Sequence, residues 1–113
     1  MKQLSHLFIL ISFVFSCSQQ PAPAKPNNFI PQEEMSQIME EVMLLEAFYQ
    51  KKYGAPSVYK DPLALAAEGV FKKHKISAKI YEDNFTYYAQ QYEIFKEMND
   101  AIIERLNKKI VKP

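Results

Sequence analysis

Residues 31–53 read PQEEMSQIMEEVMLLEAFYQKKY, and the spacing of their apolar side chains decides the fold. Large apolar residues recur every three or four positions, which is the spacing of one side of an α-helix. They are Met35, Ile38, Met39, Val42, Leu45 and Tyr49. Pro31 suits the first turn of a helix, where its missing N–H group is not needed. Gly54 and Pro56 interrupt the pattern, so the stretch predicts one amphipathic helix that ends near Tyr53.

A second helical pattern lies between residues 61 and 75. Asp61 and Pro62 are residue types that favour the N-cap and the first position of a helix, so the second helix is expected to begin there. Its apolar residues again recur at helical spacing. They are Leu63, Ala66, Ala67, Val70 and Phe71. The basic run at 72–75 is expected at the C-terminal end, where positive charge is favourable.

The rest of the chain also predicts helix. Ser77 is expected to act as an N-cap, with the apolar Ile76 before it. No Gly or Pro lies between Ser77 and Val111, so one long helix and two helices joined by a bend near residues 89–92 both stay open. No segment shows the alternation of a strand. The sequence therefore predicts an all-α domain, a small bundle of three to four helices.

The first residues carry a different pattern. Lys2 is followed by an almost continuous apolar run from Leu4 to Phe15. This run is too short to cross a bilayer, since a membrane helix needs about 20 residues, and it has the length of a secretory leader. It ends in Val14-Phe15-Ser16-Cys17, which resembles the lipobox of bacterial lipoproteins. We expect cleavage before Cys17 and acyl chains on its thiol, which would hold the protein to a membrane.

Residues 18–28 (SQQPAPAKPNN) contain three prolines and no large apolar residue, a composition typical of an extended, disordered tether. The expected organisation is a signal peptide at 1–16, a lipidated cysteine and flexible tether at 17–28, and a helical domain at 29–113. No acidic run follows Cys17. In the Bacteroidetes-type lipoproteins that this chain resembles, such a run is associated with surface export. We therefore expect an anchor in the outer membrane that faces the periplasm.

The helical part resembles a known family. Its pattern consists of the step Lys73-His74-Lys75-Ile76-Ser77, the pair Tyr87-Tyr88, and a closing helix with Phe95, Met98, Ile102 and Leu106. This order is similar to the DUF4296 family of small Bacteroidetes lipoproteins, and the resemblance covers about residues 29–106. Asn84 stands where the family tends to have Ser, and Tyr92 where it often has Pro. The family name records an unknown function, so the resemblance implies a fold, a leader and a compartment, and no activity.

Composition bears on the classes of function. The leader removes one of the 14 basic residues and none of the 13 acidic ones, so the mature chain is balanced in charge. Nucleic-acid binding, which needs a basic surface, is therefore not expected. The single cysteine and His74 provide no paired metal site, and no catalytic motif is present. We expect no metal, no cofactor and no enzymatic activity, and we interpret His74 as complementing a helix dipole.

Acidic residues of the first helix are a further candidate for a metal site. Four glutamates fall on two faces, and successive ones on a face are about 10 Å apart, too far to chelate one ion. They are Glu33, Glu34, Glu40 and Glu41. We interpret them as a solvated acidic face.

Aromatic residues crowd into residues 81–95. Three of them are expected in the core: Phe85, Tyr88 and Phe95. Tyr87 and Tyr92 are left open between surface and interface, because tyrosine suits both. Met43 belongs to a group of methionines on the first helix, and such faces can serve as adaptable binding surfaces. Tyr87, Tyr92 and Met43 are therefore the candidate interaction surface.

The leading functional hypothesis is a membrane-anchored, non-enzymatic interaction or accessory module that binds another envelope protein. One alternative is a chaperone-like periplasmic factor, which a concave apolar groove between the first and last helices would favour. A second alternative is a glycan-binding protein that uses its tyrosines.

Overall fold

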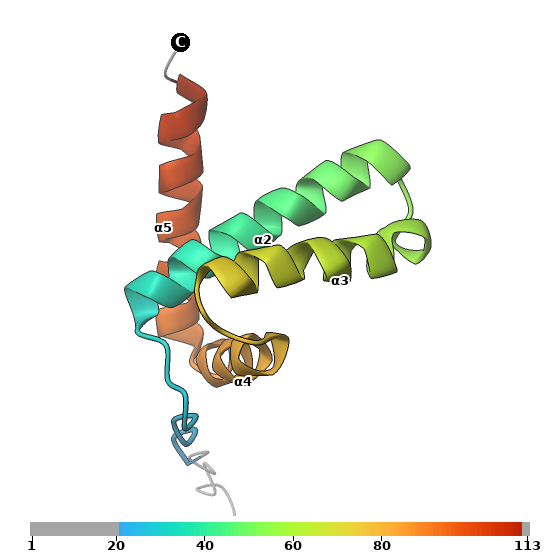
Figure 1. Cartoon of the computed structure of the whole chain (residues 1–113). Helices are drawn as coiled ribbons and strands as arrows, with labels where there is room; N and C mark the ends of the chain where they lie inside the picture. The colour runs from blue at the N-terminus through green and yellow to red at the C-terminus, as the bar shows by residue number, and fades with distance from the viewer. Residues whose placement is uncertain (1–20, 112–113) are drawn as a thin grey trace, which may run out of the picture.

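The computed structural model describes residues 21–111, so the predicted leader and Cys17 lie outside the described residues. Within that range the chain forms four α-helices and no strand, which confirms the expected all-α fold (Figure 1). The helices are α2 (Gln32–Tyr53), α3 (Pro56–Lys73), α4 (Ala78–Ala89) and α5 (Tyr92–Val111). α2 and α3 lie antiparallel as a long hairpin, and α5 crosses the N-terminal half of α2.

The core lies where α2 meets the other three helices. Met35 and Ile38 of α2 and Ile102 of α5 are completely buried. Phe71 of α3 and Tyr88 of α4 complete the same cluster. Burial of one such side chain contributes about 1.5–3 kcal/mol, so this shared cluster is a major source of the packing among the four helices. The apolar spacing of residues 31–53 therefore identifies the central helix of the fold.

The turn between α2 and α3 differs from expectation. Gly54 ends α2 with φ +78°, a conformation that favours glycine. α3 then begins at Pro56, so the predicted start at Asp61 and Pro62 is wrong and Pro62 lies inside the helix. Two features explain the earlier start: Pro56 occupies a first helical position that suits it, and Tyr59 gains a buried site, with 4% of its surface exposed.

The connection between α3 and α4 is a tight C-terminal cap followed by an N-cap. The N–H of Ile76 donates to the carbonyl of Phe71 at 2.9 Å, and that of Lys75 donates to Lys72 at 3.1 Å. Lys75 adopts φ +57°, which only glycine accepts without strain. Ser77 then caps α4 as predicted, because its hydroxyl oxygen accepts from the Ile80 N–H at 3.2 Å.

The question of one helix or two after Ser77 is answered in favour of two. α4 ends at Ala89 and α5 begins at Tyr92, although neither Gly nor Pro is present. The Gln91 side chain donates to the backbone carbonyl of Tyr87 at 3.0 Å. The backbone carbonyl of Gln91 accepts from the Phe95 N–H at 2.9 Å. Gln91 thus satisfies backbone groups of both helix ends, which permits a bend without proline.

The segment before α2 is fastened to the middle of α4. The Asn84 side chain accepts from the N–H of Ile30 and donates to the carbonyl of Asn28, each at 2.8 Å. The Tyr88 hydroxyl donates to the carbonyl of Ile30 at 2.6 Å. Asn84 is completely buried. We call Asn84 and Tyr88 the clasp, because together they hold both polar groups of one backbone residue.

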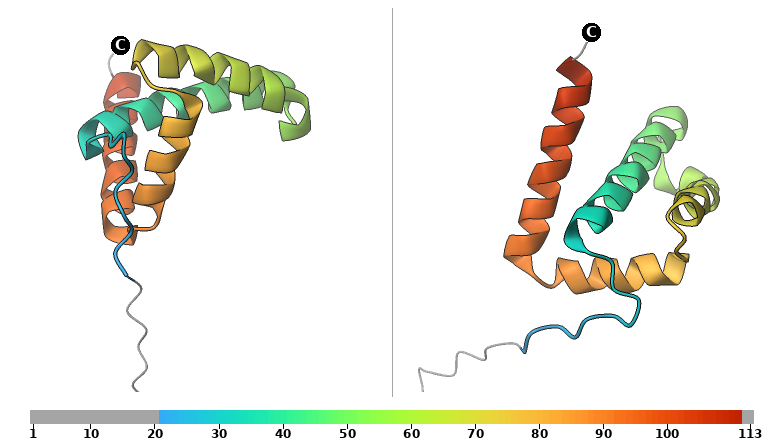
Figure 2. Two further views of the ribbon diagram at one scale, coloured as in Figure 1. Left: turned by 60° about the horizontal axis from the view of Figure 1, so that its bottom comes forward. Right: turned by 60° about the vertical axis from the view of Figure 1, so that its left-hand side comes forward.

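Two ends of the structure project from the packed centre. Figure 2 shows the far end of the α2–α3 hairpin and the C-terminal end of α5 diverging from α4, which forms the base. The segment before α2 runs beside α4 at the base. The hairpin end therefore lies at the opposite end of α2 from the point where the chain enters the domain.

Candidate binding groove

A groove of about 430 Å³ lies between α2, α4 and α5. Its apolar lining comes from all three helices: Met39, Val42, Met43, Tyr81, Phe85 and Phe95. The groove lies in the angle that the bend at Gln90 and Gln91 sets between α4 and α5, and α2 forms its third side. Mixed methionine and aromatic linings favour binding of apolar groups of varied shape.

A row of aromatic rings forms one wall of the groove. Phe71 and Tyr81 have ring centroids 4.8 Å apart, and Tyr81 lies 6.0 Å from Phe85. Phe85 meets Phe95 edge to face at 5.5 Å. Such pairs stabilise each other by about 0.5–1.5 kcal/mol beyond their buried area. The wall is therefore held by contacts among its own rings.

The polar rim of the groove is acidic. Glu46 of α2 and Glu82 of α4 line it, and neither makes an ion pair within residues 21–111. Burial, together with the nearby Glu46 carboxylate, raises the pKa of Tyr81 to about 12. Tyr81 therefore stays neutral, and the rim carries negative charge beside an apolar floor.

Of the three residues of the predicted interaction surface, Met43 lines the groove and the two tyrosines lie elsewhere. Met43 lines the groove with 40% of its surface exposed. Tyr92 is 73% exposed at the start of α5, and Tyr87 is half-buried, with its ring edge to face against Phe29 at 5.6 Å. Neither tyrosine lines the groove.

The expectation for the core aromatics needs one correction. Tyr88 is buried as predicted, and Phe95 is half-buried. Phe85 is 36% exposed and lines the groove, so its placement in the core is wrong. Phe95 of α5 covers one side of the Phe85 ring, while another side faces the open groove.

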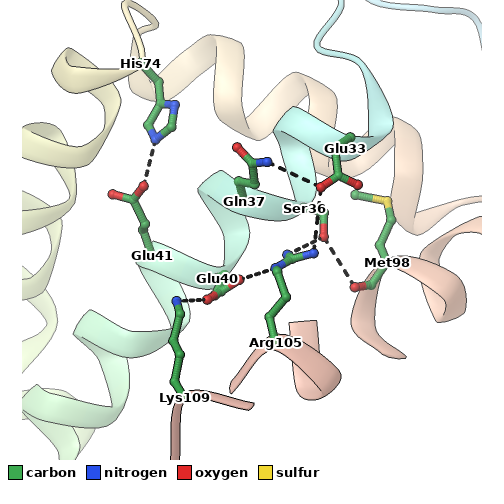
Figure 3. Close-up of polar contacts among 9 residues, drawn as sticks. All are labelled: Glu33, Ser36, Gln37, Glu40, Glu41, His74, Met98, Arg105 and Lys109. Atoms are coloured by element: carbon green, nitrogen blue, oxygen red, sulfur yellow. Dashed lines mark hydrogen bonds and ion pairs between the residues drawn. The ribbon is translucent and has the colours of Figure 1, made fainter. Parts of the chain in front are cut away.

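The interpretation of a solvated acidic face is also wrong for Glu40. This residue has 4% of its surface exposed, and its carboxylate accepts hydrogen bonds from Arg105 and Lys109 of α5 (Figure 3). Arg105 also donates to the Ser36 hydroxyl oxygen at 2.9 Å. Burial opposes the charged form of Glu40, but the bonds from Lys109 and Arg105 outweigh that effect and hold its pKa below the ordinary 4.5.

A second carboxylate joins α2 to the end of α3. Glu41 accepts from Lys73 Nζ at 2.9 Å and lies 3.0 Å from His74 Nε2. Burial again opposes ionisation, and the contacts with Lys73 and His74 lower the Glu41 pKa. His74 therefore joins two helices, in addition to its place at a helix end. The two ion clusters thus join α2 to α5 and to the end of α3.

Other features of the described residues give less support for a binding site. A larger hollow of about 570 Å³ lies between residues Ala24–Asn28 and α4, but one of its walls is the chain's own approach segment. No group of three or more His, Cys, Asp or Glu within residues 21–111 is placed to hold a metal ion. None of the helices in this range is both long and apolar enough to cross a bilayer.

The fold and the groove define a four-helix domain of the all-α class. The family model described as "Domain of unknown function (DUF4296)" matches residues 26–112, and the chain belongs to this family. No curated protein and no solved structure matches the chain.

Proposed function

We propose that the protein is a lipoprotein, anchored through acyl chains on Cys17, that acts as a non-enzymatic binding module in the cell envelope. The groove between α2, α4 and α5 would take an apolar segment of another envelope protein. The exposed side of Met43 within this groove is the observation that carries the proposal. The lipobox-like sequence at 14–17 supports the anchor.

The acidic rim specifies the charge of the segment that the groove would bind. Glu46 and Glu82 flank the apolar lining. A segment with apolar side chains and a neighbouring Lys or Arg complements both features, and opposite charge at a rim speeds encounter and excludes acidic competitors.

A photo-crosslinking amino acid encoded at position 43 of the full chain tests the groove in intact envelopes. We expect a crosslink to one envelope protein, reduced several-fold by Glu46→Gln with Glu82→Gln because the rim charge is lost. Position 65 is the matched control, since Leu65 is 71% exposed on α3 and lies outside the groove. Equal crosslinking from positions 43 and 65 would show that the groove is not the binding site.

The anchor is tested separately. Growth with an alkyne-bearing palmitate analogue should label the wild-type chain and leave Cys17→Ala unlabelled. Label on both forms, or on neither, would contradict lipidation at Cys17, whatever the groove binds.

The chaperone-like alternative gains support from the same groove, which is concave, apolar and lies between α2 and α5 as that alternative requires. It differs in having no single partner, so position 43 would crosslink to many nascent envelope proteins. Among the tyrosines of residues 81–95, the glycan alternative would depend mainly on Tyr92, since the ring of Tyr87 contacts Phe29 and Tyr88.

A further inference from the structure

The projecting end of the α2–α3 hairpin exposes apolar and basic side chains together. Phe48, Tyr53 and Val58 have 57%, 40% and 58% of their surfaces exposed. Lys51 and Lys52 lie between them in the sequence and are also exposed. We call these five residues the hairpin tip.

The hairpin tip is basic although the whole chain is nearly neutral. Residues 47–60 contain three lysines and neither Asp nor Glu, whereas the full chain has a net charge of +1. The flanking acid on α2 is Glu46, which lines the groove. Residues two apart point to different sides of a helix, so Glu46 faces away from Phe48. The flanking acid on α3 is Asp61, one turn beyond Val58.

Cationic and aromatic groups are in direct proximity at the tip. Lys52 Nζ lies 5.1 Å from the ring centroid of Tyr53 and 5.8 Å from that of Phe48. Tyr53 is also stacked on Tyr49 at 5.7 Å. Aromatic rings favour the boundary between lipid tails and headgroups, and lysine can keep its ammonium in the headgroups while its stem lies along apolar surface.

We propose that the hairpin tip binds the surface of an anionic lipid bilayer. Phe48, Tyr53 and Val58 would enter the interface, and Lys51 and Lys52 would contact the phosphates. The tip is a projecting end (Figure 2), a shape that enters a bilayer surface more readily than it encloses a peptide. The charge complements anionic headgroups, each lysine near such a surface contributing about fivefold to binding. The proposal does not depend on the groove or on Cys17.

The test adds the purified full chain to preformed lipid vesicles, so that it does not presuppose an anchor at Cys17. A fluorescent amino acid encoded at position 58 reports contact with lipid through quenching by a spin-labelled lipid. One set of vesicles contains phosphatidylglycerol with phosphatidylethanolamine, and the other contains phosphatidylcholine alone. We expect strong quenching only in the phosphatidylglycerol vesicles, with a loss at high salt because screening weakens the attraction.

Matched variants separate charge from fold. Lys51→Gln with Lys52→Gln should weaken the contact about 25-fold, while glutamine preserves helix propensity. Lys72→Gln with Lys75→Gln removes the same charge at the other end of α3 and should change nothing. Equal quenching in both kinds of vesicle, or equal loss in both double variants, would overturn the proposal. Shielding of position 58 in native envelopes but not in lipid vesicles would assign the tip to a protein partner and would also overturn it.

Discussion

Asn84 illustrates how one side chain can hold a backbone segment. Its amide oxygen accepts from Ile30, and its amide nitrogen donates to the carbonyls of Asn28 and Ile80, all at 2.8 Å. Two carbonyl acceptors and one N–H donor fix which end of the amide is oxygen. A serine or threonine hydroxyl has one hydrogen to donate, whereas the Asn84 amide donates two and accepts one, so it satisfies all three backbone groups at once.

Replacing Asn84 by Ala is expected to lower the free energy of unfolding by about 2–3 kcal/mol. The buried N–H of Ile30 would lose its partner, and such a loss carries the desolvation penalty of the group. Urea denaturation followed by circular dichroism measures the change. Asn107→Ala, in an exposed position on α5, is the control and should stay within about 0.5 kcal/mol of wild type. Equal midpoints for the two variants would show that the clasp contributes nothing.

Lys75 is a second residue that affects stability, in this case through its backbone conformation. At φ +57° the Cβ of Lys75 crowds the backbone, and glycine avoids this strain because it has no Cβ. We expect Lys75→Gly to raise the free energy of unfolding by about 0.5–1 kcal/mol. Lys72→Gly, inside the last turn of α3, should lower it by a similar amount. Thermal unfolding of the two variants side by side tests this, and a drop for both would contradict the role of the left-handed cap.

At the scale of elements, the crossing of α2 and α5 depends on the Glu40 cluster. The folded pKa of Glu40 lies below its ordinary value, so the unfolded chain binds the proton more readily. The stabilisation is therefore present above about pH 4.5 and is lost as pH falls through the lower, folded value. Glu41, whose pKa is lowered by Lys73 and His74, adds to the same dependence.

Glu40→Gln should flatten this pH dependence. We expect it to lower the free energy of unfolding by about 3 kcal/mol at neutral pH, because Arg105 and Lys109 lose their counter-charge. The difference from wild type should shrink at pH 3, where the wild-type carboxylate is also becoming neutral. Urea unfolding at both pH values measures it. Glu68→Gln, an exposed position on α3, is the control. A difference that stays constant with pH would contradict the assignment.

The helices could be predicted where the sequence pattern that defines them is local. Residue spacing located α2, and a single hydroxyl identified the start of α4 at Ser77. The start of α3 was not predictable from Asp61 and Pro62, because it lies at Pro56 and buries Tyr59, which depends on the folded chain. The bend between α4 and α5 likewise has no glycine or proline to announce it, and the bond from the Gln91 side chain to the Tyr87 carbonyl is seen only in the folded chain.

At the scale of the whole molecule, the sequence indicated part of the groove and none of its geometry. Met43 was chosen for its residue type and does line the groove. Phe85 was instead expected in the core, because its exposure follows from the angle between two helices. Glu40 and Arg105 lie 65 positions apart, and Ile30 and Asn84 lie 54 apart, so no spacing rule brings them together. The basic hairpin tip was hidden by the neutral total charge.

The clasp also determines how the domain would respond to mechanical load. A pull on the segment before α2 reaches the fold at Asn28 and Ile30, just ahead of the helix. There the bonds from Asn84 and Tyr88 would share the force in parallel, and α4 would pass it to the core. Without them the force would act on the end of α2, where helical bonds break one after another. The clasp would thus keep the first turn of α2 intact while the chain ahead of it is under tension.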